Sequence, residues 1–131
     1  MNSLNKVQNG KATISNVLAE RLMNFSVNVI KLAGKVNENF AGRQIAGQLI
    51  RSSTSAGANY EEACSAESRA DFVHKLQIVL KELRESVYWL RLILRTGMFE
   101  NQKVDLLIKE TNELANIIGK SILTAKKNKK A

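Results

Sequence analysis

The chain of 131 residues carries 20 Lys+Arg against 12 Asp+Glu, a formal net charge of +8, and it contains no proline. Its length suits one domain with a modest core, and a hydrophobic content of 44% excludes a disordered chain. The single cysteine excludes an internal disulfide, and no apolar run reaches the roughly 18 residues of a membrane span. The first 15 residues lack the apolar segment of a secretory signal, so we expect a cytoplasmic protein.

The N-terminal third of the chain predicts an arm followed by a helix. Residues 1–14 are polar and aperiodic, and we expect them to form a flexible arm. From Ser15 onward, apolar residues recur at alternating steps of four and three, which predicts a helix with one buried stripe. This stripe contains Leu18, Leu22, Phe25, Val29, Leu32 and Val36. The segment NENFAG (37–42) is expected to end the helix and turn the chain.

A second helix is predicted from about Arg43 to Cys64, although it contains the segment RSSTSAGANYEEA (51–63). Serine and threonine compete with the backbone for hydrogen bonds, and glycine costs about 1 kcal/mol relative to alanine in a helix. One face of this helix nevertheless carries a core pattern: Ile45, Leu49, Ser53, Ala56, Tyr60 and Ala63. We therefore expect the small residues to let a neighbouring helix approach closely.

The third and fourth helices are predicted from their caps and apolar stripes. Ser68 caps the third helix, with Asp71 in its first turn, and Gly97 ends it. Its stripe contains Phe72, Leu76, Val79, Leu83, Val87, Leu90 and Leu94. Asn101 caps the fourth helix, whose stripe contains Val104, Ile108, Thr111, Ala115, Ile118 and Ile122. Residues 126–131 form a basic, frayed tail, so the chain is predicted to be all-α, an antiparallel up-down four-helix bundle over residues 15–125.

Several segments together resemble a known family. These are Gln48-Leu49-x-Arg51-Ser52-Ser53-x-Ser55-x-x-x-Asn59-Tyr60-x-Glu62-Ala63, then Ser68-x-x-Asp71-Phe72, then Leu80-Lys81-Glu82-Leu83-Arg84-Glu85-Ser86-x-Tyr88-Trp89-Leu90. Over residues 20–125 the chain is similar to the 23S rRNA-intervening-sequence proteins, also called S23-type bundles. The resemblance implies an up-down four-helix bundle that closes into a homo-oligomeric ring, typically a pentamer. A related bundle, the accessory variability determinant of diversity-generating retroelements, binds a reverse transcriptase and nucleic acid.

A polar stripe on the second helix contains Arg51, Ser55, Asn59 and Glu62. In an antiparallel hairpin, Arg51 falls level with Glu82 of the third helix, and Asn59 falls level with His74. The stripe is interpreted as a polar network that fixes helix register, with a ligand site as the alternative.

Catalytic groups are few. His74 is the only histidine and Cys64 the only cysteine. We interpret His74 as structural and Cys64 as a small buried hydrophobe. Helical ion pairing, such as Lys81 with Glu85, explains the carboxylates, and no glycine-rich phosphate loop is present. We therefore expect no enzyme activity, no metal site and no cofactor.

The third helix carries two further features. Lys81, Arg84, Tyr88, Arg91 and Arg95 lie on one outward stripe, where cations with an interleaved aromatic suit a phosphate backbone and a base. A simple solvated face is the alternative. Separately, Ile78, Trp89 and Ile93 lie off the core centre, which suggests partial exposure and a subunit interface.

These features lead to a functional hypothesis. We expect a non-enzymatic homo-oligomer that binds nucleic acid, RNA in particular, without base specificity. The binding residues would be the stripe on the third helix together with Lys126, Lys127, Lys129 and Lys130 of the tail. The alternative is a protein-interaction scaffold, such as an accessory subunit for a reverse transcriptase.

Overall fold

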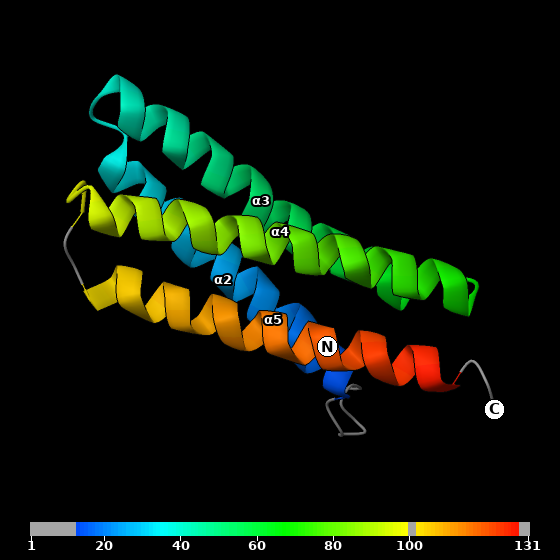
Figure 1. Ribbon diagram of the computed structural model, residues 1–131. Coiled ribbons are helices and arrows are strands. Elements are labelled where there is room, and N and C mark those ends of the chain that lie inside the picture. The colour runs from blue at the N-terminus through cyan, green and yellow to red at the C-terminus, as the bar shows by residue number, and fades with distance from the viewer. Residues whose placement is uncertain (1–12, 100–101, 129–131) are drawn as a thin grey trace, which may run out of the picture.

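The computed structural model describes residues 13–99 and 102–128, and in this part of the chain it consists of four helices. They are α2 (Ile14–Val36), α3 (Phe40–Cys64), α4 (Arg69–Arg95) and α5 (Gln102–Asn128). Each helix runs antiparallel to the one before it and packs beside it, so the helices form an up-down bundle (Figure 1). The all-α four-helix prediction is therefore confirmed.

The bundle has two different ends (Figure 1). At one end, here called the two-loop end, α2 turns into α3 and α4 is followed by the link to α5. At the other, the terminal end, α3 turns into α4, α2 begins and α5 ends. No helix in residues 13–99 and 102–128 is long and apolar enough to cross a membrane.

Side-chain caps begin three of the helices. In each, a side-chain oxygen accepts a hydrogen bond from a backbone N–H in the first turn that has no partner within the helix. The bonds are Asn16 N to Thr13 Oγ1 at 3.1 Å, Gly42 N to Asn39 Oδ1 at 2.7 Å, and Asp71 N to Ser68 Oγ at 3.0 Å. Gly97 ends α4 at a φ of 71°, in the left-handed region that glycine favours. The predictions for Ser68 and Gly97 are confirmed, and Asn101 lies outside the described residues.

Two boundaries differ from the sequence prediction. α3 begins at Phe40, because Asn39 caps it before the expected start at Arg43. The corner is tight, since a Cβ on Gly42 would lie 1.9 Å from the carbonyl oxygen of Val36. α5 continues to Asn128, so the tail begins as helix rather than frayed chain.

The predicted stripe of α2 is buried at all six positions, whereas the buried arc of α4 is rotated from the prediction. Glu82, Ser86 and Ile93 of α4 are buried, while Val87 and Leu94 are only half-buried. The reason is that α4 packs between α3 and α5, and its arc turns toward α3. On α5, Leu107 and Leu114 are likewise buried in place of Ile108 and Ala115.

The small residues of α3 lie where two neighbours press against it. Ser52, Ser53 and Ala56 are completely buried. On the α4 side, Ser52 Oγ lies 2.7 Å from Ser86 Oγ, and on the α2 side, Ser26 Oγ donates to the carbonyl oxygen of Ser53 at 3.2 Å. Larger side chains at these positions would push the helices apart. The run of poor helix formers is therefore explained by packing on both sides of α3.

Candidate nucleic-acid interface

The outward face of α4 carries five exposed side chains in one row: Lys81, Arg84, Tyr88, Arg91 and Arg95. We call this row the α4 stripe. Their spacing of three or four residues makes each a neighbour of the next on the helix surface. With a rise of about 1.5 Å per residue, the stripe extends for about 21 Å along α4 and ends at the two-loop end.

The positive charge of the stripe has no ion-pair partner in the part of the chain that the structure describes. Among the described residues, none of its four cations forms an ion pair. α4 has no acidic residue after Glu85, and both Glu82 and Glu85 turn toward Arg51 on α3. Within residues 13–99 and 102–128, the stripe therefore presents cations without ion-pair partners to solvent.

An aromatic ring lies among these cations. Tyr88 is 57% exposed, and with Arg91, Leu92 and Arg95 it lines a shallow depression of about 440 Å³. The Tyr88 and Trp89 rings meet edge to face, with centroids 5.1 Å apart. The indole Nε1 of Trp89 in turn donates to Glu85 Oε2 at 3.0 Å. The exposed ring is thus in edge contact with an indole that is itself held by a hydrogen bond.

The expected contact between Arg51 and Glu82 is present and includes a second carboxylate. Arg51 Nη1 donates to Glu82 Oε2 at 3.4 Å, and Arg51 Nη2 donates to Glu85 Oε2 at 2.5 Å. Ser55 Oγ donates to Glu82 Oε2 at 3.3 Å. Glu82 Oε1 lies 3.3 Å from Arg51 Nη2 in an ion pair that lacks hydrogen-bond alignment. Glu82, only 6% exposed, therefore relies on Arg51 and Ser55 for compensation of its charge.

The network also shifts the pKa values of two of its members. The Arg51 guanidinium, followed by the Trp89 indole, holds the pKa of Glu85 below its usual value. Conversely, Glu85 and then Glu82 raise the pKa of Arg51. Both partners are therefore charged at neutral pH, and the network links the packing of α3 on α4 to the position of Trp89 behind the stripe.

Two predicted contacts of this region are wrong. Asn59, which was expected only to lie level with His74, belongs to the polar network, because its amide donates to the carbonyl and hydroxyl oxygens of Ser55. His74 is exposed. Glu62 lies outside the network and accepts from Lys75 Nζ at 2.6 Å. Glu85 hydrogen-bonds Arg51 and Trp89 rather than forming the expected pair with Lys81. Helical spacing favoured Lys81 of α4 as the partner of Glu85, whereas Glu85 contacts Arg51 of the neighbouring helix α3.

The predicted apolar interface also changes. Ile93 is completely buried, so its expected exposure is wrong, while Ile78 and Trp89 are half-buried. The more exposed apolar row lies on α2, at Met23, Val27 and Ile30. It borders a groove of about 280 Å³ between α2 and α3, floored in part by Gly57. This row recurs at steps of four and three in the sequence, a signal from which no interface was predicted.

The remaining candidates lie near the terminal end. Lys126 and Lys127 are exposed in the last turn of α5, and Lys129 and Lys130 lie outside the described residues. Cys64 is exposed, which corrects the expectation of a buried thiol, although desolvation raises its pKa. No group of three His, Cys, Asp or Glu residues in the described ranges could hold a metal ion.

Comparison with known proteins identifies the family. A model described as "23S rRNA-intervening sequence protein" matches residues 15–120. The chain belongs to this family. The chain is also similar to a solved crystal structure, that of a protein with unknown function from the S23 ribosomal protein family of Bacteroides thetaiotaomicron VPI-5482. The two sequences are 33% identical, and the TM-score is 0.75. The match covers 82% of this chain and 96% of that one, and no curated protein matches. The resemblance seen in the sequence is thus confirmed.

Proposed function

We propose that the protein is a non-enzymatic, homo-oligomeric helical bundle that binds nucleic acid, RNA in particular, without base specificity. The observation that carries this proposal is the α4 stripe, whose four cations lack acidic partners among the described residues and surround an exposed tyrosine. Cations on a rigid helix attract phosphates of any sequence, and an aromatic ring stacks on any unpaired base.

The tail and the stripe are separate contacts in this proposal. The last turn of α5 lies near the start of α4, where Arg69 Nη1 donates to the carbonyl oxygen of Ala125 at 3.3 Å. Arg91 and Arg95 lie at the opposite end of α4. Lys126 and Lys127 therefore extend the basic surface at the terminal end rather than enlarging the stripe, so a variant of the stripe leaves the tail unchanged.

Titration with labelled single-stranded RNA and duplex DNA at two salt concentrations tests the stripe. Wild type should bind both, with a salt slope of about three for RNA if four cations meet phosphates, since each contributes about 0.7. The double variant Arg84→Glu/Arg91→Glu should bind much more weakly and show a shallower slope. The double variant Lys109→Glu/Lys120→Glu, at exposed positions of α5, makes the same charge change and should weaken binding less.

Two results would oppose the proposal. Equal losses in the two double variants would mean that net charge, rather than the stripe, determines binding. If wild type fails to bind either nucleic acid at low salt, the nucleic-acid function is wrong. The alternative, a protein-interaction scaffold, would then be favoured, because the apolar groove between α2 and α3 offers a surface for a partner helix.

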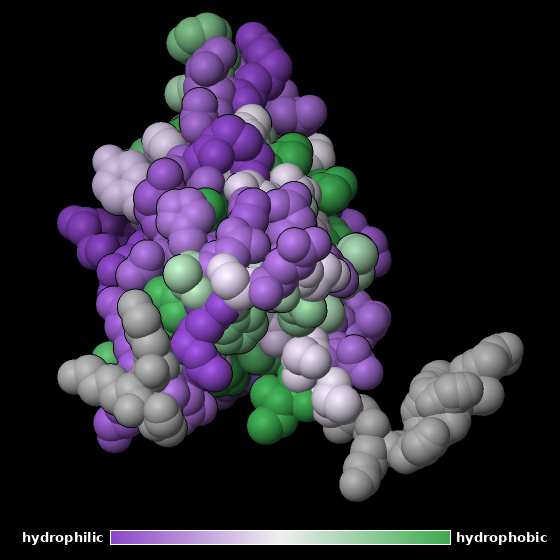
Figure 2. Space-filling model, turned by 90° about the vertical axis from the view of Figure 1, so that its right-hand side faces the viewer, coloured by the Kyte–Doolittle hydropathy of each residue, from purple (hydrophilic) through white to green (hydrophobic). Residues whose placement is uncertain are grey.

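Self-association is the second part of the proposal, and exposed apolar surface supports it. Met23, Val27 and Ile30 form an exposed apolar row on α2. The face shown in Figure 2 also has apolar patches within a mostly hydrophilic surface. Ile78 and Trp89 form a second, half-buried candidate surface on α4. An oligomer would repeat the stripe in every subunit, so weak phosphate contacts would combine by avidity.

Light scattering at micromolar concentration tests self-association. Wild type should have the mass of several subunits, and Val27→Glu should lower it, because a charge on an apolar interface must be desolvated. Ile78→Glu, measured in parallel, reports on the α4 surface, and Lys109→Glu controls for the change in charge. A monomeric wild type would refute self-association, and an unchanged mass for both apolar variants would exclude both surfaces.

A further inference from the structure

The α4 stripe is densest around Tyr88. Arg84 lies four residues before this ring and Arg91 three residues after it, so both are its neighbours on the helix surface. With a rise of about 1.5 Å per residue, they lie about 6 Å and about 4.5 Å from Tyr88 along the helix axis. The ring is thus flanked by a cation on each side. A nucleic-acid strand has the matching order, because each base lies between two phosphates of its backbone.

The Tyr88 ring keeps at least one face free of the neighbouring indole. The residue is 57% exposed, and its ring meets Trp89 edge to face at an interplanar angle of 77°. In such an arrangement the indole covers one face of the phenol at most. Tyr88 also lines the shallow depression of about 440 Å³ together with Arg91 and Arg95. The space beside the ring is therefore concave and basic, which suits a flat base attached to a phosphate.

The position of the ring depends on a chain of contacts that reaches the next helix. The Trp89 indole donates from Nε1 to Glu85 Oε2 at 3.0 Å, and Arg51 of α3 donates to the same oxygen at 2.5 Å. Trp89 is also half-buried, so packing limits its rotamers. A side chain whose neighbour is fixed loses less conformational freedom when a ligand immobilises it. The contacts of Trp89 therefore prepare Tyr88 for stacking.

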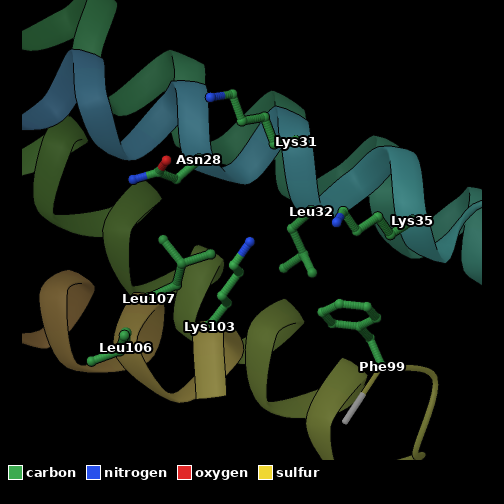
Figure 3. Close-up of a pocket in the computed structure, with 8 residues that line it drawn as sticks. All are labelled: Asn28, Lys31, Leu32, Lys35, Phe99, Lys103, Leu106 and Leu107. Atoms are coloured by element: carbon green, nitrogen blue, oxygen red, sulfur yellow. The ribbon is translucent and has the colours of Figure 1, made fainter. Parts of the chain in front are cut away.

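The pocket between α2 and α5 is arranged differently. Its volume is about 280 Å³, and Leu32 and Leu107 point into it from opposite helices, with the Phe99 ring at one side (Figure 3). The Lys31 amine points away from this apolar interior (Figure 3). The α4 stripe, by contrast, places its ring and its arginines in one exposed row.

We propose that Tyr88, positioned by Trp89, makes the α4 stripe select unpaired RNA over duplex RNA. This inference rests on the nucleic-acid function proposed above and adds the class of ligand. Arginines alone favour a duplex, which carries one charge per about 1.7 Å of its axis against about 3.4 Å for one strand. The bases of a duplex are stacked on one another, whereas an unpaired base is free to stack on the ring. Such stacking strengthens binding about tenfold.

An unstructured RNA of about 12 nucleotides and its duplex with the complementary strand test the selection at one salt concentration. Wild type should bind the single strand at least about threefold more tightly. Tyr88→Leu keeps apolar bulk but removes the ring, so it should weaken single-strand binding about tenfold and leave duplex binding unchanged. The duplex then becomes the tighter ligand. Tyr88→Phe, the matched control, keeps the ring and should keep the preference.

Two variants of Trp89 test its positioning role. Trp89→Leu should weaken single-strand binding about threefold and leave duplex binding unchanged, because Tyr88 loses its fixed neighbour. Trp89→Phe keeps an aromatic contact and should restore most of the preference. A loss of folding would weaken both ligands equally. Trp89 is the only tryptophan of the chain, so its emission in wild type should change more with the single strand than with the duplex.

The outcomes separate this inference from the proposed function. Wild type that binds neither RNA would refute both. Binding of both RNAs without a single-strand preference, or a preference that Tyr88→Leu leaves intact, would overturn the inference and leave the proposed function standing. Equal effects of Trp89→Leu on the two ligands would remove the positioning role of Trp89. A preference that Tyr88→Leu reverses, while Arg84→Glu/Arg91→Glu weakens both ligands, is the expected result.

Discussion

The α3–α4 seam and the α2–α5 seam each contain an arginine bonded to two glutamates, yet they pack differently. α3 and α4 contact each other most extensively in the bundle, and α2 and α5 contact each other least among neighbouring helices. Buried serines line the first seam, and Glu82 of its ion-pair cluster is buried. In the second seam the arginine and both glutamates are partly exposed, and the helices leave a pocket beside them.

We interpret this difference as packing that determines how deeply the ion pairs are buried. Small side chains bring α3 and α4 together, and the close approach removes Glu82 from water. α2 and α5 contact each other less, and their ion pairs remain in contact with solvent. A buried carboxylate depends strongly on its partners, whereas an exposed pair contributes little.

The largest expected effect comes from enlarging a side chain in the close seam. Ser52→Leu adds volume at a completely buried position and removes a hydrogen bond to Ser86, so the free energy of unfolding should fall by about 3 kcal/mol. Ser52→Ala should cost only about 1 kcal/mol, because Ser86 keeps its bond to the carbonyl oxygen of Glu82 at 3.0 Å. Urea unfolding measures the loss in free energy for each variant. Equal losses for Ser52→Leu and Ser52→Ala would show that close packing does not restrict the size of the side chain at this position.

A smaller effect should separate the two arginines. Arg51→Ala leaves the buried Glu82 with only Ser55 as a side-chain donor, and should lower the free energy of unfolding by about 2 kcal/mol. This value lies between the 3–5 kcal/mol or so of a broken buried pair and the limit of about 1 kcal/mol for an exposed one. Arg21→Ala should cost within about 1 kcal/mol, because its glutamates remain solvated.

The cost of Arg51→Ala should also depend on pH. Arg51 lowers the pKa of Glu85 in the folded state, so the pair stabilises the fold fully above the ordinary glutamate pKa of about 4.3. That stabilisation is lost as the pH falls through the lowered pKa, when Glu85 becomes protonated. The difference between wild type and Arg51→Ala should therefore shrink below about pH 4. Equal losses in the free energy of unfolding for Arg51→Ala and Arg21→Ala at pH 7 would contradict the expected difference between the α3–α4 and α2–α5 seams.

Sequence reasoning predicted the helices and their order because apolar periodicity and caps are local signals. The stripe of α2, the cap at Ser68 and the stop at Gly97 follow from residues within a few positions. The misplacement of Ile93 has a different cause. A helix between two neighbours buries a broad arc, and its centre depends on how closely each neighbour approaches.

The candidate sites show the same division. The α4 stripe and the Arg51–Glu82 contact were predictable, since one lies on a single helix and the other follows from an antiparallel hairpin. The pocket between α2 and α5 was missed, because Lys31 and Lys103 are far apart in the chain and their helices are not consecutive. These residues come close only because α2 and α5 pack together in the folded bundle, and the spacing of residues within one helix does not predict that contact.

The corner at Gly42 has a consequence for motion. Only three residues link α2 to α3, and Gly42 leaves no room for a Cβ against the carbonyl oxygen of Val36, so we expect the two helices to move together. The ion pair between Arg51 and Glu82 and the contact between Ser52 and Ser86 hold α4 against α3. Opening of the bundle is therefore expected to cost least where α5 meets α2, because these neighbouring helices contact each other least.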